Sequence, residues 1–71
     1  MLSYRMVNED ILEVTETSHT FHNTKRTYWY YNIKTWFKSS HGKENDVPDR
    51  KMNEADIEWV KKYFIPKVDF T

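Results

Sequence analysis

The chain has 71 residues, no Cys, and 11 Lys or Arg against 11 Asp or Glu, so its formal net charge is zero. This length allows one domain at most, spanning 1–71, and the lack of Cys excludes disulfide bridges and thiolate metal sites. No apolar run approaches the roughly eighteen residues that a membrane helix needs. We therefore expect a cytoplasmic protein that makes no membrane contact.

The charges are distributed unevenly along the chain. Residues 19–43 carry five Lys or Arg, three His and no acidic residue, whereas the acidic residues lie in the two flanking segments. A basic block inside a neutral chain indicates an anionic partner, unless folding places the acidic segments beside it.

The N-terminal segment allows two interpretations. Leu2, Tyr4 and Met6 alternate as in a short strand that would end in a turn at 8–10, whereas Tyr4, Val7 and Ile11 have the spacing of a helix face. We favour the strand. It would support the hairpin predicted next, because a two-stranded hairpin alone is only marginally stable in water.

Residues 13–22 and 27–38 are predicted to form an antiparallel hairpin connected by residues 23–26. The first segment is rich in Thr, and the second holds six aromatic residues in twelve positions, a composition typical of strands. Residues 39–49 collect Ser, Gly, Asn, Asp and Pro, and they are predicted to form a loop.

A helix is predicted at 53–65. Asn53 is a suitable N-cap, with Asp56 at the third helical position, and Pro66 ends the helical pattern. The apolar residues from Ile57 to Phe64 fall on one broad arc. The predicted fold class is therefore α+β, with a small antiparallel sheet packed against one C-terminal helix.

The two faces of the predicted strand 27–38 differ in charge. One face is free of charge and should pack against the helix; it carries Trp29, Tyr31, Ile33, Thr35 and Phe37. The opposite face carries Lys34 and Lys38, which are costly to bury. We therefore expect that face to be open, with Tyr28, Tyr30 and Trp36 as aromatic residues that the core does not use.

The sequence offers little for catalysis or for a cofactor. A chain with one Gly cannot form a glycine-rich phosphate loop. His19 and His22 are three positions apart on a predicted strand, so they point to opposite faces and cannot readily share a metal ion. We expect no enzymatic activity, no cofactor and no metal.

An exposed aromatic face usually marks an interaction site. The leading hypothesis is a small inhibitor or adaptor that occupies the surface of a larger protein, of a style that phages and mobile elements encode. A single-stranded nucleic-acid module is the first alternative, because aromatic rings on a sheet can stack on bases while Lys and Arg contact phosphates. A self-associating protein is the second. In each case the predicted contact residues are Tyr28, Tyr30, Lys34, Trp36, Lys38, Lys25 and Arg26.

Overall fold

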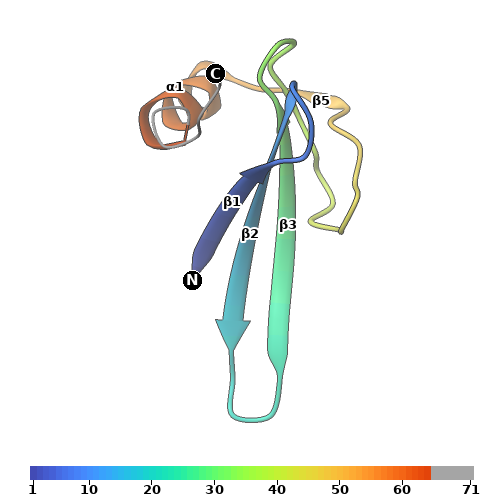
Figure 1. The fold of residues 1–71 in the computed structure, drawn as a ribbon, viewed down its shortest axis with the longest axis vertical. Coiled ribbons are helices and arrows are strands. Elements are labelled where there is room, and N and C mark those ends of the chain that lie inside the picture. The colour runs from blue at the N-terminus through green and yellow to red at the C-terminus, as the bar shows by residue number, and fades with distance from the viewer. Residues whose placement is uncertain (65–71) are drawn as a thin grey trace.

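A computed structural model describes residues 1–64. It contains a five-stranded antiparallel sheet in the order β1-β2-β3-β4-β5 and one helix, so the predicted α+β class is confirmed (Figure 1). The elements are β1 (Leu2–Met6), β2 (Ile11–His19), β3 (Thr24–Asn32), β4 (Phe37–Lys38), β5 (Arg50–Lys51) and α1 (Glu54–Tyr63).

The central hairpin pairs β2 with β3 in a continuous register from Ile11 opposite Asn32 to His19 opposite Thr24. Its connection is residues 20–23, earlier in the chain than the predicted 23–26. Thr20 and Asn23 close this turn, because the Thr20 amide donates to the Asn23 carbonyl at 2.7 Å and the Asn23 amide donates to the Thr20 hydroxyl at 3.1 Å. Residues 24–26, predicted as a turn, therefore belong to the strand.

The predicted strand 27–38 is wrong in its second half, because the chain reverses at residues 33–36. The side-chain oxygen of Asn32 accepts hydrogen bonds from the amides of Lys34 and Thr35 at 2.9 and 3.0 Å. An Asn side chain that binds amides two and three residues ahead mimics a backbone turn. The turn closes at Trp36, whose amide donates to the Asn32 carbonyl at 2.8 Å and whose φ is 60°.

The reversal changes which residues share a face. β4 runs antiparallel to β3 with Lys38 opposite Tyr31, so Lys38 lies on the helix side of the sheet. Thr35 and Phe37, which were expected in the core, are exposed.

The N-terminal segment is a strand, as favoured from its alternation. β1 pairs with β2 over five residues. The turn that joins them is held by Asn8, whose side-chain oxygen accepts from the amides of Asp10 and Ile11 at 2.8 and 3.0 Å.

The helix α1 begins at the predicted place. The Asn53 side chain accepts from the Asp56 amide at 2.8 Å, and Phe64 is the C-cap. Ile65, the last residue of the predicted helix, lies outside the described residues. Among residues 1–64, no helix is long and apolar enough to cross a membrane.

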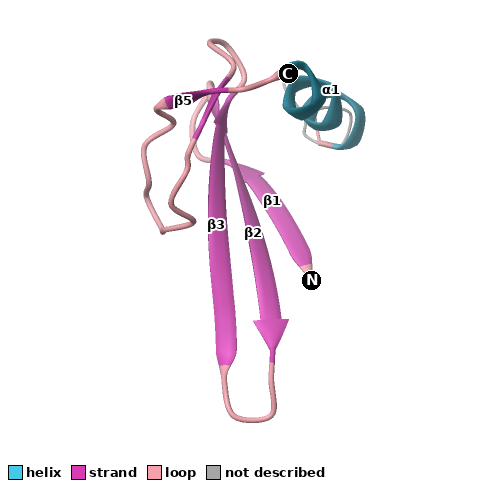
Figure 2. Ribbon diagram, turned by 180° about the vertical axis from the view of Figure 1, so that it is seen from behind, coloured by secondary structure: helices cyan, strands magenta, loops and turns pink. Residues whose placement is uncertain are grey.

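The core lies between α1 and one face of the sheet. Val60 of α1 and its C-cap Phe64 pack there with Leu12 and Val14 of β2. Trp29 and Ile33 are partly buried beside them. The helix and the connection between β4 and β5 lie on opposite sides of the sheet's upper part (Figures 1 and 2). We refer to these sides as the helix face and the loop face.

Candidate functional site

The loop face is covered in its upper part, which corrects the expectation that it is open. Tyr30 is only 3% exposed. Its hydroxyl donates to the Glu13 carboxylate at 2.8 Å and accepts from the Asn45 amide at 2.8 Å. Residues 39–49, predicted correctly as a loop, fold back over this face, so Tyr30 is a structural residue.

Glu13 is a buried carboxylate and is held by two donors. Arg5 Nε lies 2.8 Å from one carboxylate oxygen, and the Tyr30 hydroxyl lies 2.8 Å from the other. The hydrogen bond from Arg5 is the main cause that lowers the pKa of Glu13, with that from Tyr30 assisting against the opposing effect of burial. Burial raises the pKa of Tyr30. The carboxylate thus stays charged and fixes the tyrosine beneath the loop.

Three further predicted contact residues lie in the β3–β4 turn and in β4. Lys38 is half-buried on the helix face, where its Nζ lies 2.6 Å from Asp56 of α1. Trp36 is half-buried and packs against the core, with Lys61 Nζ 5.0 Å from its ring centroid. Lys34 is exposed in the β3–β4 turn. The reversal at residues 33–36 brings Trp36 and Lys38 against α1, so they form no common surface with Tyr30 on the loop face.

The remaining predicted residues lie on the hairpin. Tyr28 is half-buried on the loop face, and its amide donates to the Gly42 carbonyl at 3.1 Å. Lys25 and Arg26 are exposed and, as neighbours on a strand, point to opposite faces. Of the seven residues, only Lys25 and Arg26 belong to the projecting part of the molecule described next.

The β2–β3 hairpin extends well beyond the rest of the sheet. β1 reaches only as far as Thr17, which opposes Arg26 on β3. Residues 17–26, which we call the finger, are therefore a two-stranded ribbon, and no helix or loop among residues 1–64 covers either of its faces (Figures 1 and 2). The molecule measures 38 × 24 × 23 Å, and the finger accounts for its elongation.

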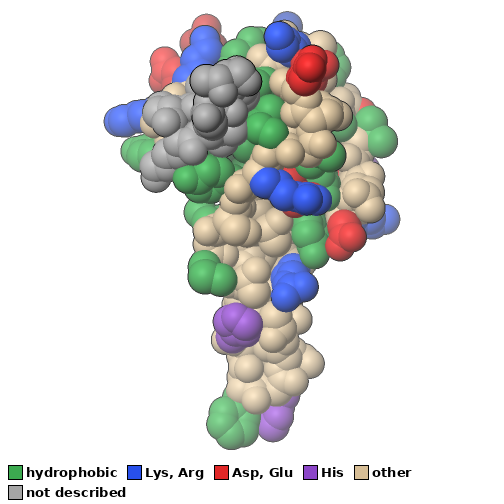
Figure 3. Space-filling model, viewed as in Figure 1, with side chains coloured by type: hydrophobic (Ala, Val, Ile, Leu, Met, Phe, Trp, Pro, Cys, Tyr) green, Lys and Arg blue, Asp and Glu red, His purple; other side chains and the backbone are tan. Residues whose placement is uncertain are grey.

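The finger tip carries an exposed aromatic residue. Phe21 is 95% exposed, and its ring meets the His22 ring edge-on at a centroid distance of 4.8 Å. Figure 3 shows hydrophobic and His side chains together at the far end of the finger. Below the tip, His19 Nδ1 lies 3.1 Å from the Thr24 hydroxyl. The finger contains two His, one Lys, one Arg and no acidic residue. It is a basic ribbon that is closed by the hydrogen bonds between Thr20 and Asn23 and ends in an apolar ring.

Phe21 was missed as a candidate because the predicted first strand ran through it. The available signal was its position between Thr20 and a polar segment, where a large apolar residue has no strand neighbour to pack against. The polar residues around Phe21 were therefore the signal for a turn in which the ring is not buried.

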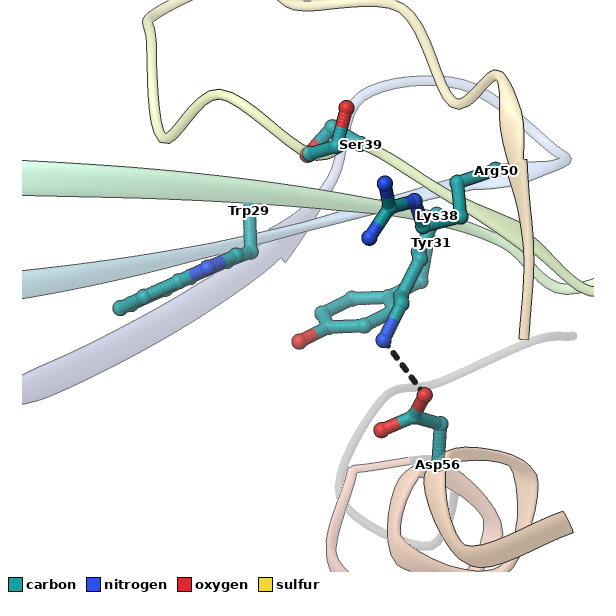
Figure 4. Close-up of a pocket in the computed structure, with 7 residues that line it drawn as sticks. Trp29, Tyr31, Lys38, Ser39, Arg50 and Asp56 are labelled. Carbon is teal, nitrogen blue, oxygen red and sulfur yellow. Dashed lines mark hydrogen bonds and ion pairs between the residues drawn. The ribbon is translucent and has the colours of Figure 1, made fainter. Parts of the chain in front are cut away.

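A shallow pocket of about 320 Å³ lies on the helix face beside Trp29 and Tyr31 (Figure 4). Burial and the charge of Asp56 raise the pKa of Tyr31 to about 12, so its hydroxyl stays protonated at neutral pH. Asp56 is already paired with Lys38 across this pocket. The pocket thus places no free base beside a nucleophile, and its ion pair holds α1 to β4.

Metal ligands are also scattered. Across residues 1–64, no group of three or more His, Asp or Glu side chains is placed to hold a metal ion. Comparison with protein-family models, curated proteins and solved structures finds no match to this chain.

Proposed function

We propose that the protein is a non-catalytic binding module that acts as an inhibitor or adaptor by inserting its finger into a recess on a larger protein. The observation that carries the proposal is Phe21, which is 95% exposed at the end of the projecting ribbon. The sequence predicts a contact on the loop face of the sheet, around Tyr30. Because residues 39–49 cover that face, we propose the finger as the contact instead. The lack of Cys supports action in a reducing compartment such as the cytoplasm.

The finger tip is suited to tight insertion. Full burial of a Phe side chain contributes about 1.5–3 kcal/mol, and aromatic residues are common anchors in protein interfaces. The hydrogen bonds between Thr20 and Asn23 hold the tip before binding, so less conformational entropy is lost when a partner closes around it.

The positive charge of the finger indicates which residues should surround the recess on the partner. Lys25 and Arg26 project to opposite sides behind the tip, and residues 17–26 contain no acid to repel a carboxylate. An acidic rim around an apolar pocket would match this pattern, with the rim charges accelerating encounter and fixing orientation.

The same basic ribbon is the observation that favours nucleic acid as a second candidate. Ring stacking on single strands, however, uses several exposed aromatic residues in a row. The rings expected to form that platform are Tyr28, Tyr30 and Trp36, of which Tyr30 is buried and Trp36 packs on the core. One exposed ring at a tip fits a protein pocket better than a stacking platform.

Photocrosslinking from the finger tip tests the proposal. A benzophenone amino acid replaces Phe21 in one sample. In the matched control it replaces Phe37, which is 37% exposed on the body, as we call the molecule outside the finger. Both proteins are irradiated in host lysate, with and without nuclease. We expect a protein adduct from position 21 only, unaffected by nuclease.

Purified partner then allows a quantitative measurement. Phe21→Ser should weaken binding at least about tenfold, the equivalent of roughly 1.4 kcal/mol, whereas Phe37→Ser should not. Equal binding by both variants would contradict the role of the finger. Adducts that vanish with nuclease would favour the nucleic-acid candidate.

A further inference from the structure

The two edges of the sheet differ in how they are protected. The β5 edge has only two residues, Arg50 and Lys51, and Pro48 lies just before it. Short length, charge and Pro are the usual devices that keep an edge strand from pairing with another chain. The β1 edge has five residues, a continuous register with β2, no Pro and one charged residue. Its protection is therefore much weaker.

The charge on β1 is already neutralised within the molecule. Arg5 is the only charged residue of the strand, and its Nε lies 2.8 Å from the buried carboxylate of Glu13 on the loop face. An approaching strand would not have to break this pair, because the Arg5 side chain lies off the plane in which strands pair.

The hydrogen bonds show which backbone groups of β1 face outward. Met1 and Thr17 exchange two bonds of 2.9 Å, and the Val7 amide donates to the Ile11 carbonyl at 2.8 Å. In an antiparallel ladder, hydrogen-bonded and non-hydrogen-bonded pairs alternate, so the backbone amides and carbonyls of the odd-numbered residues of β1 point toward β2. The amides and carbonyls of Leu2, Tyr4 and Met6 point away from β2 and have no backbone partner in the described part of the chain.

Apolar side chains accompany these free backbone groups. Leu2 is 53% exposed and Tyr4 is 38% exposed, both on the helix face. Leu2 also borders an apolar pocket of about 250 Å³ that Trp29 and Trp59 help to line. A strand added at this edge would cover apolar surface as well as satisfy backbone groups.

We propose that β1 pairs antiparallel with β1 of a second copy of this chain, about a twofold axis at Tyr4. In this register Tyr4 lies opposite Tyr4 of the second copy, and Leu2 lies opposite Met6. The outward groups of these residues would form about six hydrogen bonds by the alternation of an antiparallel ladder. The two sheets would join into one.

The charge pattern of β1 favours a second copy as the occupant. The twofold register places Arg5 opposite Ser3, so no like charges meet across the interface, and all five residues of each strand are paired. A twofold interface uses the same patch on both copies, and β1 meets that requirement with apolar residues at positions 2, 4 and 6. This inference does not depend on the finger.

Light scattering after size exclusion tests the proposal on the full chain. We expect a mass that rises from monomer to dimer with concentration, up to about 1 mM for weak association. Tyr4→Pro removes the ring and an outward amide, at a position where edge strands tolerate Pro, so it should remain folded and raise the dissociation constant at least about tenfold. The control Tyr4→Val, which also loses the ring contact with Phe64, should still dimerise through its free backbone groups.

Two variants of opposite charge at position 4 provide a second test in case Tyr4→Pro fails to fold. Tyr4→Lys and Tyr4→Glu should each be monomeric, because the twofold places two equal charges side by side, and an equimolar mixture should restore the dimer. A wild-type chain that stays monomeric throughout, or a dimer that survives both single charge variants, would overturn the proposal. Phe21→Ser should dimerise normally, which separates this result from any failure of the finger.

Discussion

The body and the finger of this protein use the same hairpin in opposite ways. In the body, β2 and β3 are covered by α1 on one face and by residues 39–49 on the other, and Leu12 and Val14 are at most 1% exposed. In the finger, the same two strands continue without cover, and Phe21 is 95% exposed. The comparison shows that the buried part of the hairpin ends near Thr17. Beyond that residue the two strands continue without a core and end in an exposed aromatic side chain.

The largest expected effect is in the body. Leu12→Ala removes a side chain from the centre of the core and should lower the free energy of unfolding by about 2–5 kcal/mol, including the cost of the cavity. Urea denaturation followed by tryptophan fluorescence measures this loss. Leu2→Ala, at a site 53% exposed, is the matched control and should cost less than about 1 kcal/mol. Equal losses would place the core elsewhere.

Substitutions of Trp36 give the next largest effect, and the Gly variant should be more stable than the Ala variant, which is the reverse of the usual order. Its ring packs on the core while its backbone has a φ of 60°, which Gly adopts more easily than other residues. Trp36→Ala should cost about 2 kcal/mol, and Trp36→Gly should be the more stable of the two by about 1 kcal/mol. Thermal unfolding of both variants checks the order. A more stable Ala variant would show that the left-handed backbone is absent.

Tyr30→Phe should cost about 1–2 kcal/mol, because Glu13 and the Asn45 amide lose a buried hydroxyl. The variant also changes the dependence on pH. The pKa of Glu13 is below its ordinary value of 4.5 in the folded state, so its contribution is complete above that value and is lost as the pH falls through the folded pKa. Unfolding curves at neutral pH and at about pH 3 should therefore differ less for the variant than for the wild type. An unchanged difference would mean that Tyr30 does not stabilise the carboxylate.

The finger should give the smallest effect. Phe21→Ser should change the free energy of unfolding by no more than about 0.5 kcal/mol, since the side chain is 95% exposed at the tip. Chemical denaturation provides the measurement. A loss comparable to that of Leu12→Ala would show that the tip folds back onto the body.

Much of the fold was predictable from local signals. The Asn53 cap, the alternation of Leu2, Tyr4 and Met6, and the β-rich hairpin each act through neighbouring residues, and each is confirmed. The reversal after Asn32 was harder to predict, because an Asn followed by Ile, Lys and Thr is compatible with both a strand and a turn. Its position decides the face of every later residue, and hence the location of Lys38.

The candidate site was less predictable than the fold. The assignment of an open face assumed that a polar loop stays away from the sheet, whereas residues 39–49 cover Tyr30 through the hydrogen bonds of Asn45 and Ser39. Sequence periodicity cannot detect such cover, because it rests on individual hydrogen bonds and not on an apolar pattern.

The order of the strands also has a consequence for how the chain folds. Because β1 to β5 follow one another in the sheet as they do in the sequence, each pairing joins adjacent segments and closes a short loop. The longest connection between paired strands is residues 39–49. A low contact order of this kind is associated with rapid folding, so stopped-flow refolding of this protein should be fast for one in which sheet predominates.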